Sequence, residues 1–279
     1  MTAGVFLVAS GARYGQMAKA AIHSLQGVED CPVTLFCEHK ARAAVEDLDG
    51  VDFVEIDTPR YNWNDKIEGF RKTPYEKSIY IDCDVLVVSK FVDDLAEALD
   101  HTDLLVRSDG IGFNFPWEYE DYPVAIPQYN TGVVAFRRAA MQPAIERWQQ
   151  LLAERPGVPD QPTFRAALIE TGMRASELPA DFNCLPNGNL VNKVRLYHCI
   201  KKKHLMHSPR KAERAMRKAA AIGLPAVIVR DHAALEHNRP SLGNLSRLFV
   251  IECFDRLRRF RRWIKYDVLG FKRRSEKRR

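Results

Sequence analysis

An apolar segment that carries two aspartates constrains this chain more than any other feature. Residues 78–88 read Ser-Ile-Tyr-Ile-Asp-Cys-Asp-Val-Leu-Val-Val, with Asp82 and Asp84 two positions apart. An ionised carboxylate buried without a partner is costly. Because side chains at i and i+2 of a strand project to the same face, both aspartates are expected to point together beyond the sheet. Hard oxygen ligands suit Mg²⁺ or Mn²⁺, so the segment predicts a seat for a metal and a diphosphate. Short acids at a strand end also arise as caps of the next helix.

Length and composition set the outer limits of the fold. The chain has 279 residues, 46% of them hydrophobic, which is enough for one substantial core plus an appendage. No stretch approaches the roughly 20 apolar residues of a spanning helix, and no apolar signal core follows the N-terminus. The six cysteines are scattered without a C-x-x-C pair, which favours reduced thiols over disulfides or zinc. We therefore expect a protein that stays in the cytoplasm.

Short apolar runs alternate with segments of helical spacing over the first 171 residues. This alternation predicts an α/β fold with a mainly parallel central sheet. Strands are expected at 5–9, 33–37, 51–56, 78–88, 104–106 and 132–136, and helices at 17–25, 41–48, 91–99, 141–153 and 162–171.

Several short blocks follow one another in a fixed order between residues 4 and 205. They are Gly11-Ala12-Arg13-Tyr14, Lys66 sixteen residues before Asp82, Ile79-Tyr80-Ile81-Asp82-Cys83-Asp84, Tyr129-Asn130-Thr131-Gly132-Val133, Asp160-Gln161, and Leu178-Pro179 followed by Asp181-Phe182-Asn183. In this order they resemble the glycosyltransferases of the A-type fold that use sugar nucleotides, most closely the family 8-like enzymes. The resemblance implies a single nucleotide-sugar-binding domain at 1–210. Apolar spacing and charge beyond it predict a helical, basic extension at 211–279.

The resemblance gives the first turn and Lys66 a place beside the nucleotide. Tyr14 occupies the position of an aromatic that packs on uracil, although a tyrosine that opens a helix is also often part of the core. Ser10, Gly11 and Ala12 stand where the family usually has acidic residues that hold base and ribose, so the base is less well specified. Lys66 is expected beside the diphosphate, where a cation stabilises the charge of the leaving group. Arg71 is a possible second contact, and solvated helix residues are the alternative for both cations.

The donor sugar is expected to meet four polar residues. Asp109 resembles the acid that holds sugar hydroxyls, and the amide of Asn130 is a further candidate. In the resembled enzymes the acid of the Asp160-Gln161 pair binds the donor sugar, and the glutamine lies near the anomeric carbon in a front-face mechanism that retains configuration. Asp160 has an alternative as a helix cap before Pro162.

The third metal ligand follows the last strand of the predicted domain. Family members carry there a histidine that binds metal, and then a Gly-Lys-Pro-like loop whose lysine binds phosphate. His198 is preferred because it ends an apolar strand, with Lys201 as the phosphate ligand, but the Gly and Pro are absent here. His204 and His207 are the alternatives. The implied cofactor is Mn²⁺ or Mg²⁺.

Charge and apolar spacing set the C-terminus apart. Residues 255–279 carry twelve Lys or Arg against three acids, whereas the whole chain has a net charge of +6. An apolar stripe from Leu245 to Val268, with arginines on the opposite face and Trp263 near its end, is typical of an interfacial membrane helix. We expect attachment to the inner face of the membrane rather than to nucleic acid, whose binding needs interleaved aromatics. Packing of the stripe onto the domain remains an alternative.

A segment rich in aromatic residues precedes Asn130. Residues 108–129 interleave aromatics with Gly, Pro and acids, so they form either an acceptor-binding lid or an irregular segment that covers the core.

These features together predict a metal-dependent glycosyltransferase that moves a sugar from a nucleoside-diphosphate sugar, expected to be a UDP-sugar, to a hydroxyl of a glycan or lipid-linked acceptor. Two alternatives stay open. An aspartate-nucleophile phosphatase would use Asp82 as nucleophile and Asp84 as acid, and a non-catalytic scaffold would bind sugar nucleotides and attach through its basic tail.

Overall fold

The computed structural model describes residues 2–57, 59–108, 122–123, 125–155, 158–184, 190–191, 194–199 and 226–227. All of them belong to one compact unit, Met1–Glu236. The predicted domain boundary after residue 210, the basic C-terminal helix and most of the aromatic segment lie outside the described residues. Within the described part of the chain, no helix combines the length and the apolar character needed to cross a membrane.

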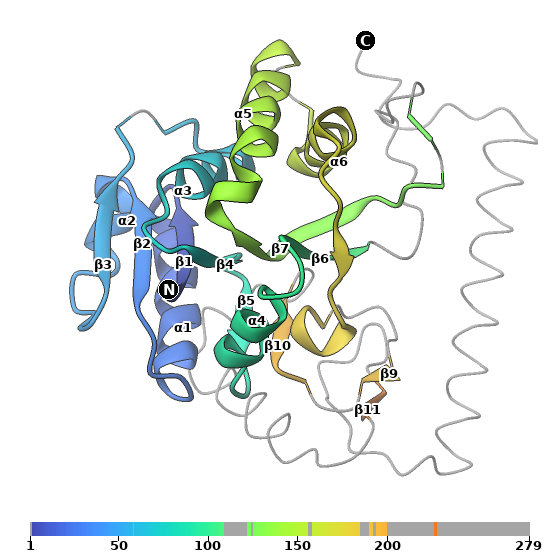
Figure 1. The fold of residues 1–279 in the computed structure, drawn as a ribbon. Helices are drawn as coiled ribbons and strands as arrows, with labels where there is room; N and C mark the ends of the chain where they lie inside the picture. The colour runs from blue at the N-terminus through green and yellow to red at the C-terminus, as the bar shows by residue number, and fades with distance from the viewer. Residues whose placement is uncertain are drawn as a thin grey trace, which may run out of the picture. The chain divides into compact units, whose positions relative to one another are not determined.

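A seven-stranded sheet forms the centre of this unit (Figure 1). The strand order is β3-β2-β1-β4-β7-β6-β8, and β7 runs antiparallel to both of its neighbours while the other pairings are parallel. The strands are β1 (Ala3–Ala9), β2 (Val33–Cys37), β3 (Asp52–Glu55), β4 (Lys77–Ile81), β6 (Leu104–Ser108), β7 (Tyr129–Arg137) and β8 (Ser176–Glu177). The predicted mainly parallel sheet is confirmed.

Helices pack on both faces of the sheet (Figure 1). One face carries α1 (Ala12–Gln26) and α4 (Val92–Ala98), and the other carries α3 (Lys66–Lys72), α5 (Arg138–Glu154) and α6 (Asp160–Thr171). The short elements are α2 (His39–Ala43), η1 (Trp63–Asp65), β5 (Val85–Val87), η2 (Ala180–Phe182), β9 (Leu190–Val191), β10 (Leu196–His198) and β11 (Ala226–Val227).

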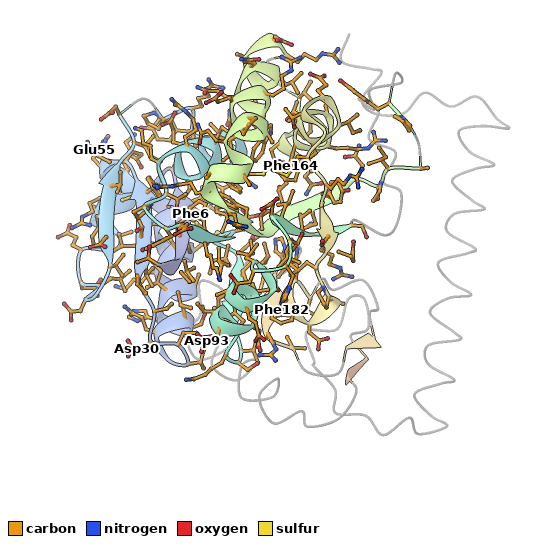
Figure 2. All side chains as sticks on the ribbon, in the orientation of Figure 1. Phe6, Asp30, Glu55, Asp93, Phe164 and Phe182 are labelled. Atoms are coloured by element: carbon orange, nitrogen blue, oxygen red, sulfur yellow. The ribbon has the colours of Figure 1, made fainter. Side chains whose placement is uncertain are left out.

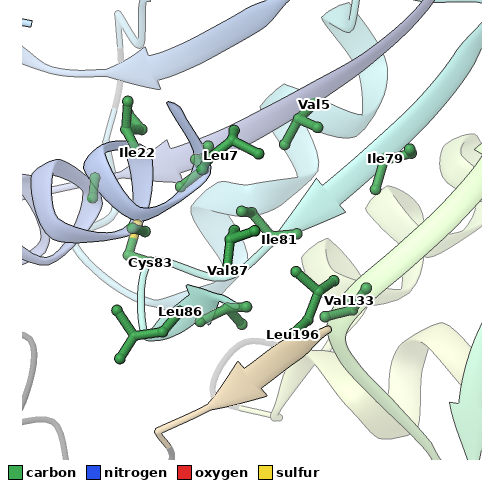
Figure 3. Packing of buried hydrophobic residues seen from close by; sticks show 14 of the residues in the cluster. Val5, Leu7, Ile22, Ile79, Ile81, Cys83, Leu86, Val87, Val133 and Leu196 are labelled. Carbon is green, nitrogen blue, oxygen red and sulfur yellow. The ribbon is translucent and has the colours of Figure 1, made fainter. Parts of the chain in front are cut away.

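Two apolar cores hold the layers together, one on each face of the sheet. Along β1, Val5 and Leu7 enter the core under α1, and Phe6 enters the core under α3 and α5, as strand alternation requires. Figure 3 shows Val5, Leu7, Ile79 and Ile81 of the first core beside Ile22 of α1. In Figure 2, Phe6 and Phe164 of the second core lie inside, whereas Asp30, Glu55 and Asp93 lie at the periphery.

The segment 78–88 does not form the single strand that its apolar character predicted. β4 ends at Ile81, residues 82–84 make a turn, and β5 then pairs with β10 in a separate two-stranded sheet. Two backbone bonds fix the turn: Asp82 N donates to Gly132 O at 2.8 Å, and Cys199 N donates to Asp84 O at 2.7 Å. The two aspartates therefore face the same space because of the turn, and the explanation by strand alternation was wrong.

The helix predicted at 41–48 is shorter than expected. α2 ends at Ala43, and successive turns follow, in which Val45 N bonds Arg42 O and Leu48 N bonds Val45 O. These turns still bury Val45 and Leu48. An apolar spacing of three residues is thus satisfied by turns as well as by a helix.

Candidate functional site

A cavity of about 320 Å³ opens where β1 and β4 end and β7 begins. This is the sheet edge at which open α/β sheets hold their ligands, and the volume lies in the range of small-molecule sites. The lining residues are Val8, Ser10, Tyr14, Met17, Asn62, Asp65, Lys66, Tyr80, Asp82, Cys83, Asp84, Asn130, Thr131, Asp160, Gln161 and His198. Nine residues predicted from the sequence are thus brought to one wall. We call Lys66, Asp82, Asp84, Asp160 and His198 the acidic half, and Ser10, Tyr14, Asn62 and Asp65 the first-turn half.

Two carboxylates and an imidazole converge in the acidic half. His198 Nε2 lies 3.2 Å from Asp84 Oδ1 and 3.8 Å from Asp82 Oδ2. One ligand atom from each residue lies within 4.8 Å of the other two. Asp84 and His198 are buried, whereas Asp82 is partly open to solvent. The arrangement brings together the ligand atoms that Mg²⁺ or Mn²⁺ takes in proteins.

The orientation of the His198 ring follows from a chain of hydrogen bonds that starts at the backbone. Gly132 N donates to Asn130 Oδ1 at 3.1 Å, which identifies this atom as the carbonyl oxygen. Asn183 Nδ2 donates to the same oxygen at 2.9 Å, so Asn183 Oδ1 turns toward His198 Nδ1 at 3.1 Å. His198 Nδ1 therefore carries a proton, and Nε2 is the ring nitrogen that faces the aspartates. Such an outer hydrogen bond is typical of metal-binding histidines, so the residues fit a divalent cation.

Gly132 allows the imidazole to approach strand β7. A Cβ at this position would lie 2.0 Å from His198 Cε1 and 2.6 Å from Nδ1, distances that no side chain tolerates. The Asn130-Thr131-Gly132 block thus supplies both the amide that fixes Asn183 and the space for the ring.

Lys66 joins two carboxylates of the acidic half. Its Nζ lies 2.9 Å from Asp160 Oδ2 and 3.3 Å from Asp82 Oδ1, and it donates to Thr131 Oγ1 at 3.2 Å. Burial opposes the charge, but the two ion pairs outweigh it and raise the pKa of Lys66 above its ordinary value. Lys66 is 6% exposed, so the alternative of a solvated helix residue is wrong for this position.

Arg71 fits the solvated alternative instead. Its guanidinium pairs with Glu68 on the same helix, on the surface, and it does not line the cavity.

Asp82 lies between Lys66 and His198 and turns one carboxylate oxygen toward each. Its Oδ1 accepts a hydrogen bond from Tyr80 OH at 2.5 Å and faces Lys66, while its Oδ2 faces His198. Burial, and then the charge of Asp82, raise the pKa of Tyr80 well above its ordinary value, so the phenol remains a donor.

Asp160 is the first residue of α6, and the N-cap position of this helix is held by Pro159. Its carboxylate instead accepts from Thr131 Oγ1 and pairs with Lys66. The interpretation of Asp160 as a helix cap is therefore wrong. Gln161, the next residue, lines the cavity beside it.

The first turn forms the other half of the cavity wall. Tyr14 lines the cavity and is 37% exposed, so its alternative as a core residue is wrong. Gly11 has a φ of +92°, a conformation that favours glycine. Its N–H donates to Glu38 Oε1 at 2.7 Å, and Lys40 N and Ala41 N donate to the same carboxylate. Glu38 thus fixes the turn that sets Ser10 and Tyr14 on the wall.

Four predicted ligands cannot be compared with the cavity. Asp109, Lys201, and the alternative metal ligands His204 and His207 lie outside the described residues. The five described cysteines, Cys31, Cys37, Cys83, Cys184 and Cys199, are free thiols, as expected. Burial raises the pKa of Cys37 to about 11.

Sequence reasoning assigned no role to Asn183, Thr131, Tyr80 or Asp65, although all four reach or support the cavity. Asn183 and Thr131 stand inside blocks that carry the family resemblance, so their position was a signal. Asp65 directly precedes Lys66, and its polar type at the start of a helix gave no signal beyond that of a cap.

Comparison with solved structures assigns the fold. The galactosyltransferase LgtC in complex with donor and acceptor sugar analogues superposes with a TM-score of 0.57 at 15% identity, over 78% of this chain and 95% of that chain. An LgtC active-site mutant with glutamate in place of glutamine gives 0.51 at 16% identity, over 70% and 86%. The glycosyltransferase GlyE of Streptococcus pneumoniae TIGR4 gives 0.54 at 13% identity, over 80% and 66%.

No protein-family model matches the sequence, and no curated protein does. The fold of this chain is the A-type fold of glycosyltransferases.

Proposed function

We propose that this protein is a metal-dependent glycosyltransferase that transfers a sugar from a UDP-sugar to a hydroxyl of a glycan or lipid-linked acceptor, with retention of configuration. The observation that carries the proposal is the convergence of Asp82, Asp84 and His198 beside the Lys66–Asp160 pair, in the cavity of an A-type fold. Solved structures that share this fold are glycosyltransferases, one of them with donor and acceptor sugar analogues.

The acidic half divides its work between two groups of residues. Asp82, Asp84 and His198 would hold Mn²⁺ or Mg²⁺, which when bound offsets the negative charge of the departing diphosphate. Asn183 keeps Nε2 of His198 turned toward this place. Because these groups are fixed by buried hydrogen bonds, little reorganisation is needed when the donor enters.

Asp160 and Gln161 face the donor sugar in this proposal. The acceptor oxygen forms a bond to the anomeric carbon as the bond from that carbon to the diphosphate oxygen breaks, and the acceptor proton passes to the diphosphate. Retention needs attack on the face that the diphosphate leaves, with Gln161 beside that carbon. Support comes from the family resemblance of the Asp160-Gln161 pair and from its place on the cavity wall. NMR of the product anomer tests it, and an inverted product would refute retention.

Lys66 receives a more specific role than a simple phosphate contact. Three protein oxygens, from Asp160, Asp82 and Thr131, already face its ammonium group. We propose that Lys66 holds both carboxylates in place, and that its positive charge also acts on the diphosphate through space.

The C-terminal segment supplies the proposal for localisation. Twelve Lys or Arg at 255–279, with an apolar stripe preceding and overlapping them, support attachment to the anionic inner face of a membrane. Binding of the full chain to vesicles with and without anionic lipid tests this part. Equal binding to neutral vesicles would contradict an electrostatic attachment.

Calorimetric titration with UDP, with and without Mn²⁺, tests the central proposal. We expect metal-dependent binding that Asp84→Asn abolishes, while Asp47→Asn, which alters an exposed acid paired with Lys19, leaves it unchanged. A donor screen with glycan and lipid-linked acceptors then measures transfer. Binding without transfer to any acceptor would support the scaffold, and hydrolysis of a phosphate monoester would support the phosphatase, which the A-type fold disfavours.

A further inference from the structure

Two residues on the wall of the first-turn half each have a buried side-chain oxygen with no hydrogen-bond partner among the described residues. The atoms are Ser10 Oγ and Asp65 Oδ2, and the two residues are 7% and 5% exposed. Both residues line the cavity, and the other unpartnered atoms of this kind, on Arg42, Asn64 and Gln128, do not. A buried polar atom without a partner destabilises the folded protein, so its retention at a cavity wall points to a ligand.

The residues before and after Asp65 hold it in position. Its Oδ1 accepts from Arg60 N at 2.8 Å, so the carboxylate cannot turn freely and Oδ2 is the oxygen left for another donor. Lys66, the next residue, is anchored to Asp82 and Asp160. Tyr61 holds a φ of +56°, and Asn62 Oδ1 accepts from Asn64 N at 2.9 Å, so the segment leading to Asp65 follows a defined turn. This carboxylate is therefore set in place before any ligand binds.

The charge of Asp65 selects which part of a sugar nucleotide can approach it. A carboxylate repels a diphosphate, which the cation cluster and Lys66 attract on the acidic half. No ion pair of Asp65 occurs among the described residues, so its charge is not offset by a protein cation. The nucleoside is uncharged and carries N–H and O–H donors, and it is the part that suits this wall. Tyr14, exposed on the same wall, offers a ring surface for a base.

We propose that Asp65 and Ser10 determine the nucleoside specificity of the donor site, with Asp65 Oδ2 accepting a hydrogen bond from the nucleoside and Ser10 Oγ bonding a neighbouring polar atom of it. The donor to Asp65 is either the imide N–H of a uracil-type base or a ribose hydroxyl. The inference rests on the proposed function, since it assigns residues to one part of the same donor.

Asp65→Asn provides a direct test, because asparagine keeps an oxygen for Arg60 N and presents an NH₂ group where Oδ2 was. The full chain with Mn²⁺ is titrated with UDP, CDP, 2′-deoxy-UDP and 3′-deoxy-UDP. If Asp65 contacts the base, Asp65→Asn weakens UDP binding about tenfold or more. CDP affinity then rises relative to UDP affinity, because cytosine N3 is an acceptor where uracil N3–H is a donor. If Asp65 contacts the ribose, Asp65→Asn weakens UDP binding and CDP binding alike. One deoxy analogue then binds the wild type weakly, and its affinity does not fall further in the variant.

Two further variants separate the inference from a general effect. Ser10→Ala is expected to weaken UDP by severalfold. Glu68→Gln removes a carboxylate from α3, the helix that directly follows Asp65, on the surface beside Arg71, and should leave UDP binding unchanged. Circular dichroism and thermal unfolding confirm that each variant is folded.

The outcomes distinguish this inference from the proposed function. Metal-dependent UDP binding that is the same, within twofold, in wild type and Asp65→Asn overturns the role of Asp65 and leaves the proposed function intact. Absence of nucleotide binding by the wild type at any Mn²⁺ concentration overturns both.

Discussion

In the acidic half of the cavity the buried polar groups bond to one another, whereas in the first-turn half two buried oxygens have no partner among the described residues. Lys66, Asp82, Asp160, Thr131 and Tyr80 form a connected network. Ser10 Oγ and Asp65 Oδ2 lie on the same cavity wall without such bonds. The network around Lys66 is completed by protein groups, and the first-turn half is completed by a ligand. A connected network contributes to folding, and unpartnered groups reduce stability in exchange for recognition.

The largest effect should come from removing the centre of the network. Lys66→Met leaves the buried carboxylate of Asp160 and the partly buried carboxylate of Asp82 without their cation, which is expected to cost about 3–5 kcal/mol of the free energy of unfolding, measured by urea denaturation. Lys72→Met, on the same helix but in an exposed pair with Glu68, should cost about 0.5 kcal/mol or less. Adding Asp160→Asn to Lys66→Met should recover part of the loss. A cost for Lys66→Met no larger than that of Lys72→Met would show that the network does not stabilise the fold.

The second effect concerns metal affinity. Asn183→Leu removes the acceptor for His198 Nδ1–H, so the ring can adopt the other tautomer or rotate. We expect Mn²⁺ affinity, measured by calorimetry, to fall about 10–100-fold. Nitrogen-15 NMR of the metal-free protein should show a protonated Nδ1 in wild type, with part of this population lost in Asn183→Leu. Asn183→Asp keeps an acceptor and should retain the Nδ1 proton, and a wild type without a proton on Nδ1 would refute the assigned hydrogen bond.

The sequence predicted those parts of the site that depend on residues close together in the chain. Apolar runs alternating with helical spacing sufficed for a parallel sheet, and acids directly after such a run, Asp82 and Asp84, were correctly placed at its carboxyl edge. The turn between β4 and β5 was missed because Val85–Val87 is as apolar as the strand before it. Backbone bonds from Asp82 to Gly132 and from Cys199 to Asp84 determine the turn, and these partners are distant in sequence.

The role of Asn183 could not be predicted for the same reason. It acts through Asn130, 53 residues away, and His198, 15 residues away. Asn130 was expected to bind sugar hydroxyls, and this stays a prediction for its NH₂ group, while its carbonyl oxygen accepts from Gly132 N and Asn183 Nδ2. A polar residue identified by its family block can thus also support the site through other side chains, by contacts that only the fold creates.

The third prediction concerns Glu38, the acid whose carboxylate fixes the first turn. Burial opposes the charge of Glu38, but three backbone N–H bonds hold its pKa below the ordinary value of 4.5. Its ionised form therefore stabilises the fold above pH 4.5, and this contribution is lost as pH falls through the lowered pKa. Glu38→Gln should cost about 0.5–2 kcal/mol at pH 7, and the difference from wild type should shrink below the ordinary glutamate pKa.

Urea unfolding of wild type and Glu38→Gln at a series of pH values measures this difference. Glu46→Gln, at an exposed position, serves as the control and should show no such dependence. A difference between wild type and Glu38→Gln that grows as pH falls would contradict the role given to the backbone bonds.

The smallest effect on stability is expected at Ser10 in the first-turn half. Ser10→Ala removes a buried hydroxyl that bonds no described protein group, so the stability of the ligand-free protein should stay the same or rise by up to about 1 kcal/mol. Ser24 is an equally buried serine whose Oγ donates to Ala21 O at 2.6 Å and accepts from Val87 N at 2.9 Å. Ser24→Ala should therefore cost about 1–3 kcal/mol, because Val87 N loses its acceptor. Equal losses in the two variants, by thermal and urea unfolding, would mean that Ser10 is bonded within the protein. A stable Ser10→Ala protein that binds UDP more weakly would show that this hydroxyl serves the ligand rather than the fold.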